Sequence, residues 1–92
     1  MEFTFSVGTA DSHEVKFKYR RLTNTVQIDV DGNQVKKDKF WIWIPAHRRY
    51  DFKVGGSERH DVDIELNIPR AWSKFRNPSC NVIVDGQLVR KY

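Results

Sequence analysis

The chain of 92 residues carries the same order of features twice, and this internal repeat restricts its fold more than any other property. Aligned with itself at an offset of 47 residues, the apolar, glycine and histidine positions of segment 5–19 fall on equivalent positions of segment 52–66. At an offset of 54, the Val-Asp-Gly at 30–32 falls on the Val-Asp-Gly at 84–86. One insertion between the two blocks of the second copy explains the change of offset. The sequence therefore predicts an internally duplicated fold.

Both copies have the pattern of β-structure. Apolar residues alternate with charged or polar ones over 15–20 and again over 62–67, the period of two that is typical of half-buried strands. Asp-Gly follows at 31–32 and at 85–86, and this dipeptide favours the positive φ angles of a tight type I′ hairpin turn. Each copy is therefore predicted to contain a hairpin.

The remaining segments are also β-prone. Phe40–Ile44 and Tyr50–Val54 are predicted to form a further hairpin, and the only helical candidate is a single turn in RAWSKF after Pro69. Eight or so short strands at this spacing indicate an all-β fold, a single antiparallel β-sandwich with an internal pseudo-twofold repeat. We expect one domain over 1–92, with repeat units at about 3–49 and 50–92.

Composition restricts the class of protein. Twelve aromatic residues and 39% hydrophobic residues indicate a chain that folds, because disordered segments are poor in both. The longest apolar run is far shorter than the roughly 20 residues of a membrane-spanning helix, and no secretory signal is visible, so we expect no membrane association. A single cysteine, Cys80, agrees with a reducing, cytoplasmic location. The net charge of +4 favours an acidic or polyanionic partner.

The order of these segments resembles a known family. FSVGTADSHEVKFKY, VQIDVDGNQVKKDKF, YDFKVGG, VDIEL and NVIVDGQLVRKY together resemble the N-terminal domain of Fas apoptosis inhibitory molecule. The chain departs from that pattern in PAHRR and IPRAWSKFRNPSCN, which are longer. The resemblance implies a compact antiparallel β-sandwich in the cytosol, with no enzymatic activity. It also implies a role in restraining death-receptor apoptosis through protein contacts.

Residues that could perform catalysis or bind a metal do not form a recognisable motif. The chain lacks a nucleophile elbow, a phosphate-binding glycine motif and the zinc motif H-E-x-x-H, and no two of its histidines and Cys80 have the spacing of paired zinc ligands. We therefore expect no enzyme, no cofactor and no metal. His13 and His60 are equivalent in the repeat, and we expect them to share a structural role where a strand begins.

The exposed residues of the two equivalent alternating segments carry opposite charge. Lys16, Lys18 and Arg20 occupy one segment, and Asp63 and Glu65 occupy the other. If the two strands are neighbours, these side chains form cross-strand pairs. If they are not, each charged row is solvated or open to a partner, and copies of the molecule could associate head to tail.

Two aromatic and basic segments are candidates for partner binding. Trp and Arg are the residue types most enriched at the energetic centres of interfaces. Candidate contact residues are Trp41, Trp43, His47, Arg48, Arg49, Arg70, Trp72 and Arg76. For Trp41, Trp43 and Trp72 the other reading is that they pack within the fold.

From the sequence we expect a non-catalytic intracellular protein-interaction domain, a monomer or weak homo-oligomer. The resemblance implies that its partners include components of death-receptor signalling. The alternative is a basic β module that binds nucleic acid or another polyanion through its Trp and Arg residues, because interleaved basic and aromatic side chains suit backbone attraction and base stacking. Dependence of binding on salt separates the two.

Overall fold

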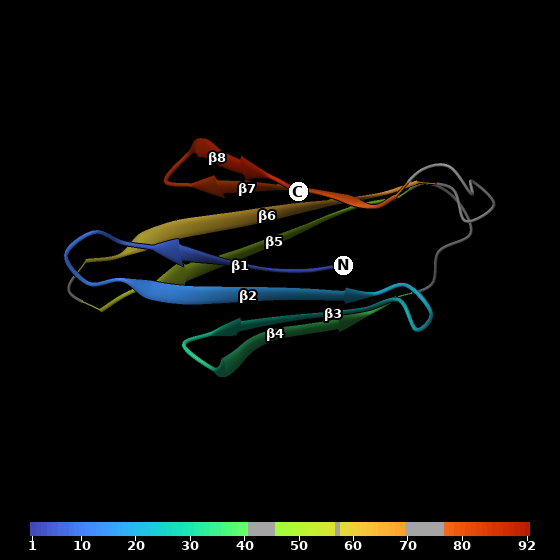
Figure 1. Ribbon diagram of the computed structural model, residues 1–92, viewed down its shortest axis with the longest axis horizontal. Helices are drawn as coiled ribbons and strands as arrows, with labels where there is room; N and C mark the ends of the chain where they lie inside the picture. Colours follow the sequence, from blue (N-terminus) through green and yellow to red (C-terminus); the bar gives the residue numbers. More distant parts are fainter. Residues whose placement is uncertain (41–45, 57, 70–76) are drawn as a thin grey trace. The chain divides into compact units, whose positions relative to one another are not determined.

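The structure is a computed structural model that describes residues 1–40, 46–56, 58–69 and 77–92. Within these ranges it contains eight β-strands and no helix (Figure 1). The strands are β1 (Glu2–Val7), β2 (His13–Arg20), β3 (Thr25–Val30), β4 (Asn33–Lys39), β5 (Ala46–Val54), β6 (His60–Ile68), β7 (Ser79–Val84) and β8 (Gln87–Lys91).

The strands form two four-stranded antiparallel sheets, with the orders β1-β2-β3-β4 and β5-β6-β7-β8. By contact, the chain divides into two compact units, Met1–Trp41 with Lys53–His60, and Ile42–Phe52 with Asp61–Tyr92. The all-β antiparallel fold class and the number of strands predicted from the sequence are confirmed. The repeat is present as two sheets that have the same strand order.

Strand pairing is equivalent in the two sheets. Phe17 of β2 lies opposite Ile28 of β3, and the equivalent Ile64 of β6 lies opposite Val82 of β7. Residues that face each other across antiparallel strands project to the same side, so each pair adds to one apolar face. All four side chains are fully buried.

The two Asp-Gly turns have the conformation that the sequence predicts. Asp31 and Gly32 have φ angles of 50° and 81°, and Asp85 and Gly86 have φ angles of 51° and 79°. Two successive positive φ angles define a type I′ turn, whose twist matches that of the flanking strands. Each aspartate also accepts a hydrogen bond at 2.9 Å through Oδ1, from the backbone N–H of Glu14 in the first copy and of Asp61 in the second.

The apolar face of each sheet supplies the core. In the first sheet Phe3 stacks on Phe17, which lies opposite it on β2, with ring centroids 4.9 Å apart. Burial of a side chain of this size stabilises the fold by about 1.5 to 3 kcal/mol. The other buried strand residues of the first sheet are Phe5, Val7, Val15, Tyr19, Val26 and Ile28. Those of the second sheet are Tyr50, Val54, Val62, Ile64, Leu66, Ile68, Cys80 and Val82.

A β-bulge interrupts the last pair of strands in each sheet. The β3–β4 register shifts so that Val35 of β4 has no opposite residue, and the β7–β8 register shifts in the same way at Val89 of β8. Both valines are about half exposed. A bulge bends its strand and increases the local twist.

Two segments for which the sequence predicts structure lie wholly or mostly outside the described residues. The helical turn in RAWSKF lies there, and so does the run Phe40–Ile44 except for Phe40 itself. The strand predicted at Tyr50–Val54 is longer, because β5 begins at Ala46. No helix with the length and hydropathy needed to cross a membrane occurs in the part of the chain that the structure describes.

Candidate functional site: a basic sheet face

Four basic side chains share the polar side of the first sheet. Lys18 of β2 lies opposite Gln27 of β3, which in turn lies opposite Lys37 of β4. One row further along, Arg20 and Lys39 lie opposite Thr25 in the same way. Because directly opposite residues project to the same side, these side chains lie in two adjacent cross-strand rows. We call Lys18, Arg20, Lys37 and Lys39 the basic face.

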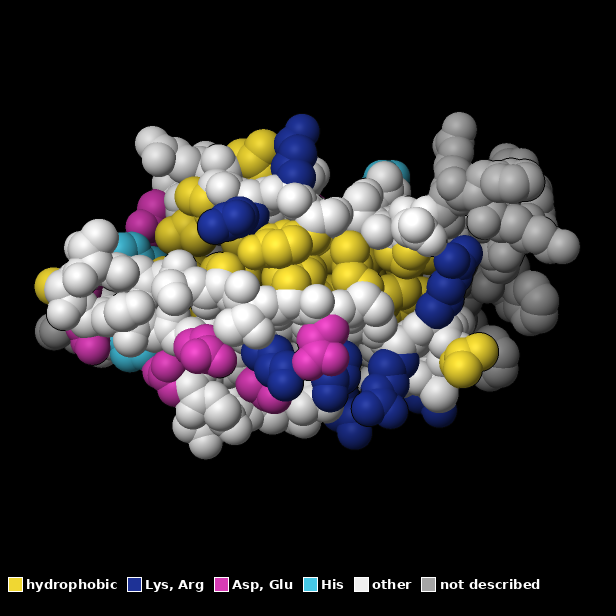
Figure 2. All heavy atoms as spheres, in the orientation of Figure 1, with side chains coloured by type: hydrophobic (Ala, Val, Ile, Leu, Met, Phe, Trp, Pro, Cys, Tyr) yellow, Lys and Arg dark blue, Asp and Glu magenta, His cyan; other side chains and the backbone are white. Residues whose placement is uncertain are grey.

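Strand geometry brings these four charges close together. Alternate residues of a strand are about 7 Å apart, and strands that are second neighbours are about 10 Å apart. The Cα atoms of the basic face therefore mark the corners of a rectangle of these dimensions. Since the Debye length at physiological ionic strength is about 8 Å, the four charges act on a bound anion together. Figure 2 shows Lys and Arg side chains gathered toward the end at which β2 and β4 finish.

The carboxylate that lies opposite Lys18 is bound to another lysine. Glu2 lies opposite Lys18, but its Oε1 lies 3.0 Å from Nζ of Lys16. The hydrogen bond and charge of Lys16 lower the pKa of Glu2, and the same bond raises the pKa of Lys16. None of the four side chains of the basic face forms an ion pair with any residue that the structure describes. The basic face is therefore available to a partner's carboxylates or phosphates.

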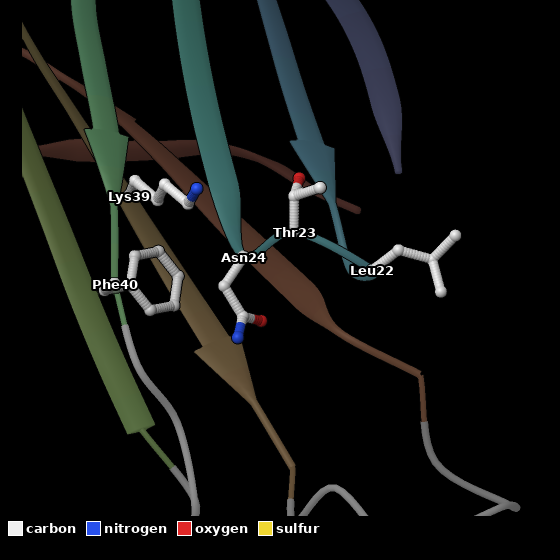
Figure 3. A pocket seen from close by; sticks show the side chains of 5 residues that line it. All are labelled: Leu22, Thr23, Asn24, Lys39 and Phe40. Carbon is white, nitrogen blue, oxygen red and sulfur yellow. The ribbon is translucent and has the colours of Figure 1, made fainter.

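A pocket lies at the end of the basic face. It has a volume of about 440 Å³ and is lined by Leu22, Thr23 and Asn24 of the β2–β3 turn and by Lys39 and Phe40 at the end of β4. Figure 3 shows Phe40 and Asn24 facing each other across it, while Leu22 extends away from the other lining side chains. Volumes in this range are typical of ligand sites.

The structure places three of the candidate partner-binding residues, all on β5. His47 and Arg49 are exposed and Arg48 is half-buried. Arg49 is paired within the sheet, since its Nε lies 3.1 Å from Oδ1 of Asp51 and its Nη2 lies 3.0 Å from Oδ2 of Asp63. The other five candidates lie outside the described residues; they are Trp41, Trp43, Arg70, Trp72 and Arg76.

The oppositely charged rows do not pair with each other. β2 and β6 belong to different sheets, so the cross-strand pairing of these rows considered from the sequence is wrong. Lys16 is paired with Glu2 in the first sheet, and Asp63 is paired with Arg49 in the second. Of the basic row, Lys18 and Arg20 remain available and become half of the basic face.

The other half of the basic face, Lys37 and Lys39, was not predicted from the sequence. Lys37 and Lys39 were not among the candidate contacts, because their position beside β2 residues depends on the register of the β3–β4 hairpin. Counting across the hairpin from Asp31-Gly32 without a bulge places Lys36 opposite Gln27 and Lys37 opposite Val26, on the apolar side. The bulge at Val35 shifts that count by one residue and moves the lysines to the polar side.

The equivalent histidines have equivalent positions, as expected. His13 is the first residue of β2, with Nδ1 2.6 Å from Oδ2 of Asp31 and Nε2 3.2 Å from Oδ2 of Asp11. His60 is the first residue of β6, with Nε2 2.9 Å from Oε1 of Glu58. Both histidines bond to an acidic side chain of the loop that precedes the strand, which confirms a shared structural role.

Cys80 lacks the environment of a nucleophile. Its side chain is buried in β7, and this burial raises the pKa of the thiol to about 12. The thiolate is the reactive form of cysteine, so a thiol with this pKa is inert at neutral pH.

The fold and the basic face define a class: a tandem-repeat, all-β protein with a basic surface on one sheet, whose four cations have no ion-pair partner in the described part of the chain. Compared with known proteins, the chain matches no family model and no curated protein sequence.

Proposed function

We propose that the chain is a non-catalytic interaction module that binds an acidic segment of a protein partner through the basic face. The observation that carries the proposal is the absence of ion-pair partners around Lys18, Arg20, Lys37 and Lys39 among the described residues. Elsewhere in these ranges, charged side chains such as Lys16 and Arg49 do have carboxylate partners. Like charges held in adjacent rows repel each other, and a partner's carboxylates would relieve this repulsion.

The burial of Cys80 supports the non-catalytic part of the proposal, because it keeps the only thiol of the chain protonated. The resemblance to the N-terminal domain of Fas apoptosis inhibitory molecule suggests the setting. In that setting the module acts in the cytoplasm, and its partner belongs to death-receptor signalling. The aromatic candidates Trp41, Trp43 and Trp72 would add apolar contact to the charge attraction of the basic face.

The proposal can be tested with charge reversal at two neighbouring lysines. Lys37→Glu reverses one charge of the basic face. Lys36→Glu makes the same change in net charge at the preceding residue, which lies opposite the buried Ile28 and so projects to the other side of the sheet. The probe is a fluorescent nonapeptide of glutamate and glycine, titrated by anisotropy. We expect Lys37→Glu to weaken binding at least about fivefold, or roughly 1 kcal/mol, and Lys36→Glu to change it little. Equal effects of the two variants would show that only net charge matters.

A second candidate function is binding of a nucleic acid strand, and the same four cations favour it. Nucleic acid binding is recognised by its salt dependence, because each phosphate contact adds about 0.7 to the magnitude of the slope of log K against log salt for a single strand. Titration of a random single-stranded oligonucleotide between about 50 and 200 mM salt measures that slope. A slope of magnitude near 3 that becomes smaller in Lys37→Glu would indicate phosphate contacts at the basic face. If the oligonucleotide also binds more tightly than the peptide, the nucleic acid is favoured over the protein partner.

A further inference from the structure

Leu22 is a large apolar side chain held in solvent beside a pocket. It lies in the turn that joins β2 to β3, and it is the most exposed large hydrophobic residue among those described. The pocket beside it is lined on the other side by Phe40, which is largely buried. Single exposed leucines are common on protein surfaces, but this one lies at the rim of a pocket of about 440 Å³, with its side chain directed away from the other lining side chains (Figure 3).

Asn24 and Phe40, which face each other across the pocket, are held in place by three interactions. The backbone N–H of Phe40 donates to the backbone oxygen of Asn24 at 3.1 Å. The hydroxyl of Tyr19 donates to Oδ1 of Asn24 at 3.2 Å, and the Tyr19 and Phe40 rings stack with centroids 6.2 Å apart and planes 8° apart. These bonds join the ends of β2, β3 and β4. A preformed site of this kind costs little conformational entropy when a ligand binds.

The pocket and the basic face are continuous. Lys39 belongs to both, and Arg20 lies two residues before Leu22. Arg21 is an exposed cation of the same turn. Lys39 is the charged residue among the described residues that line the pocket, which favours a ligand with carboxylates next to an apolar group.

We propose that the pocket receives one large apolar side chain of the partner, from a segment whose flanking carboxylates lie on the basic face. This inference rests on the proposed function and specifies its partner: an acidic peptide with a central apolar anchor. In the complex the exposed Leu22 side chain turns from solvent onto the anchor, on the side away from Phe40, so its apolar surface leaves water only when the anchor is present. Charge attraction then sets the association rate and orientation, and the anchor sets most of the lifetime.

Two synthetic peptides test the inference. One has eight glutamates around a central leucine, and the other has glycine at the centre. Burial of a leucine side chain is sufficient for at least a tenfold gain in affinity, so we expect the leucine peptide to bind about tenfold more tightly in fluorescence anisotropy.

Three variants separate the pocket from the charges. Leu22→Ser should reduce the affinity of the leucine peptide to that of the glycine peptide and leave the glycine peptide unchanged. Leu88→Ser, at an exposed leucine of β8, is the matched control and should change neither affinity. Lys37→Glu should weaken both peptides by the same factor. Because Leu22 and Leu88 are exposed, thermal unfolding of their variants should match the parent protein.

The outcomes distinguish the inference from the function on which it rests. Equal affinities of the two peptides for the parent protein, with Lys37→Glu weakening both, would overturn the anchor pocket and leave the acidic partner standing. A leucine preference that persists in Leu22→Ser would also overturn the pocket. If neither peptide binds the parent protein, both the proposed function and this inference fail.

Discussion

The imidazole of His13 joins the start of β2 to the turn after β3, with Nδ1 2.6 Å from Oδ2 of Asp31. The same carboxylate accepts the backbone N–H of Glu14 at 2.9 Å through Oδ1. On the other side of the ring, Nε2 lies 3.2 Å from Oδ2 of Asp11. Both ring nitrogens therefore have a carboxylate neighbour, an arrangement that favours the imidazolium form.

Stability should depend on the charge of this pair. The hydrogen bond to Asp31 raises the pKa of His13 above its ordinary value of 6.5, and the hydrogen bond to His13 lowers the pKa of Asp31 below 3.8. The His13 contribution is fully present below pH 6.5 and is lost as the pH rises through the raised pKa. The Asp31 contribution is present above pH 3.8 and is lost as the pH falls through the lowered pKa.

We therefore expect His13→Gln to lower the melting temperature more at about pH 5.5 than at about pH 9. Differential scanning calorimetry of parent and variant at both values measures the difference. His47→Gln, at an exposed histidine of β5, is the control and should show no such pH dependence. A His13→Gln deficit of equal size at both pH values would mean that the His13–Asp31 bond does not depend on charge.

The adjacent glycines 55 and 56 should tolerate a methyl group very differently. Gly55 has a φ of 103°, and a Cβ there would overlap the backbone oxygen of Glu58. At Gly56 a Cβ would meet nothing within 4 Å. We expect Gly55→Ala to destabilise the protein by more than about 1 kcal/mol, and Gly56→Ala to stay within about 0.5 kcal/mol of the parent. Urea unfolding of the two variants measures both, and similar midpoints would contradict the strained conformation at Gly55.

Cys80 should react slowly in the folded protein. Its thiol is buried and its pKa is about 12, so almost none is present as thiolate at pH 8. Alkylation by iodoacetamide, followed by mass spectrometry, should proceed at least about tenfold more slowly in native buffer than in denaturant. Comparable rates in native buffer and in denaturant would show that the start of β7, where Cys80 lies, opens readily.

The prediction for Trp43 comes from the sequence alone, because this residue lies outside the described ranges. If Trp43 contacts a partner, Trp43→Ala should weaken binding of an acidic peptide and leave the unfolding midpoint unchanged. A tryptophan packed in the core would instead cost about 3 to 5 kcal/mol of stability when truncated. Thermal unfolding of the variant distinguishes these two roles.

The features that could be predicted from the sequence are those with a local cause. Phe17 and Ile64 were recognised as core residues because alternation along a strand depends only on the strand's own side chains. The Asp-Gly turns were recognised because their φ angles are a property of the dipeptide. Local patterns of this kind occur in both copies, which is why the repeat could be found at all.

The candidate site could be predicted only in part, because it depends on pairing between distant residues. Lys37 reaches the polar side of the sheet through the β3–β4 register, and that register includes a bulge that leaves no clear mark on the alternation of β4. Arg49 was expected to contact a partner, yet its guanidinium donates a hydrogen bond to the carboxylate of Asp63, 14 residues away in the sequence. Neither arrangement follows from spacing along a single strand.

The bulges at Val35 and Val89 also have a consequence for solubility. β4 and β8 are edge strands, and an edge strand presents unpaired backbone groups to which another chain can add. Each sheet has a second edge strand, β1 or β5, and β4 and β8 form one equivalent pair of edges. Two similar edges on one chain increase the risk of strand exchange and fibre growth. A bulge in each edge, together with the lysines and arginine of these strands, makes both edges poor templates. The duplication could therefore double the sheet without creating a polymerising surface along β4 or β8.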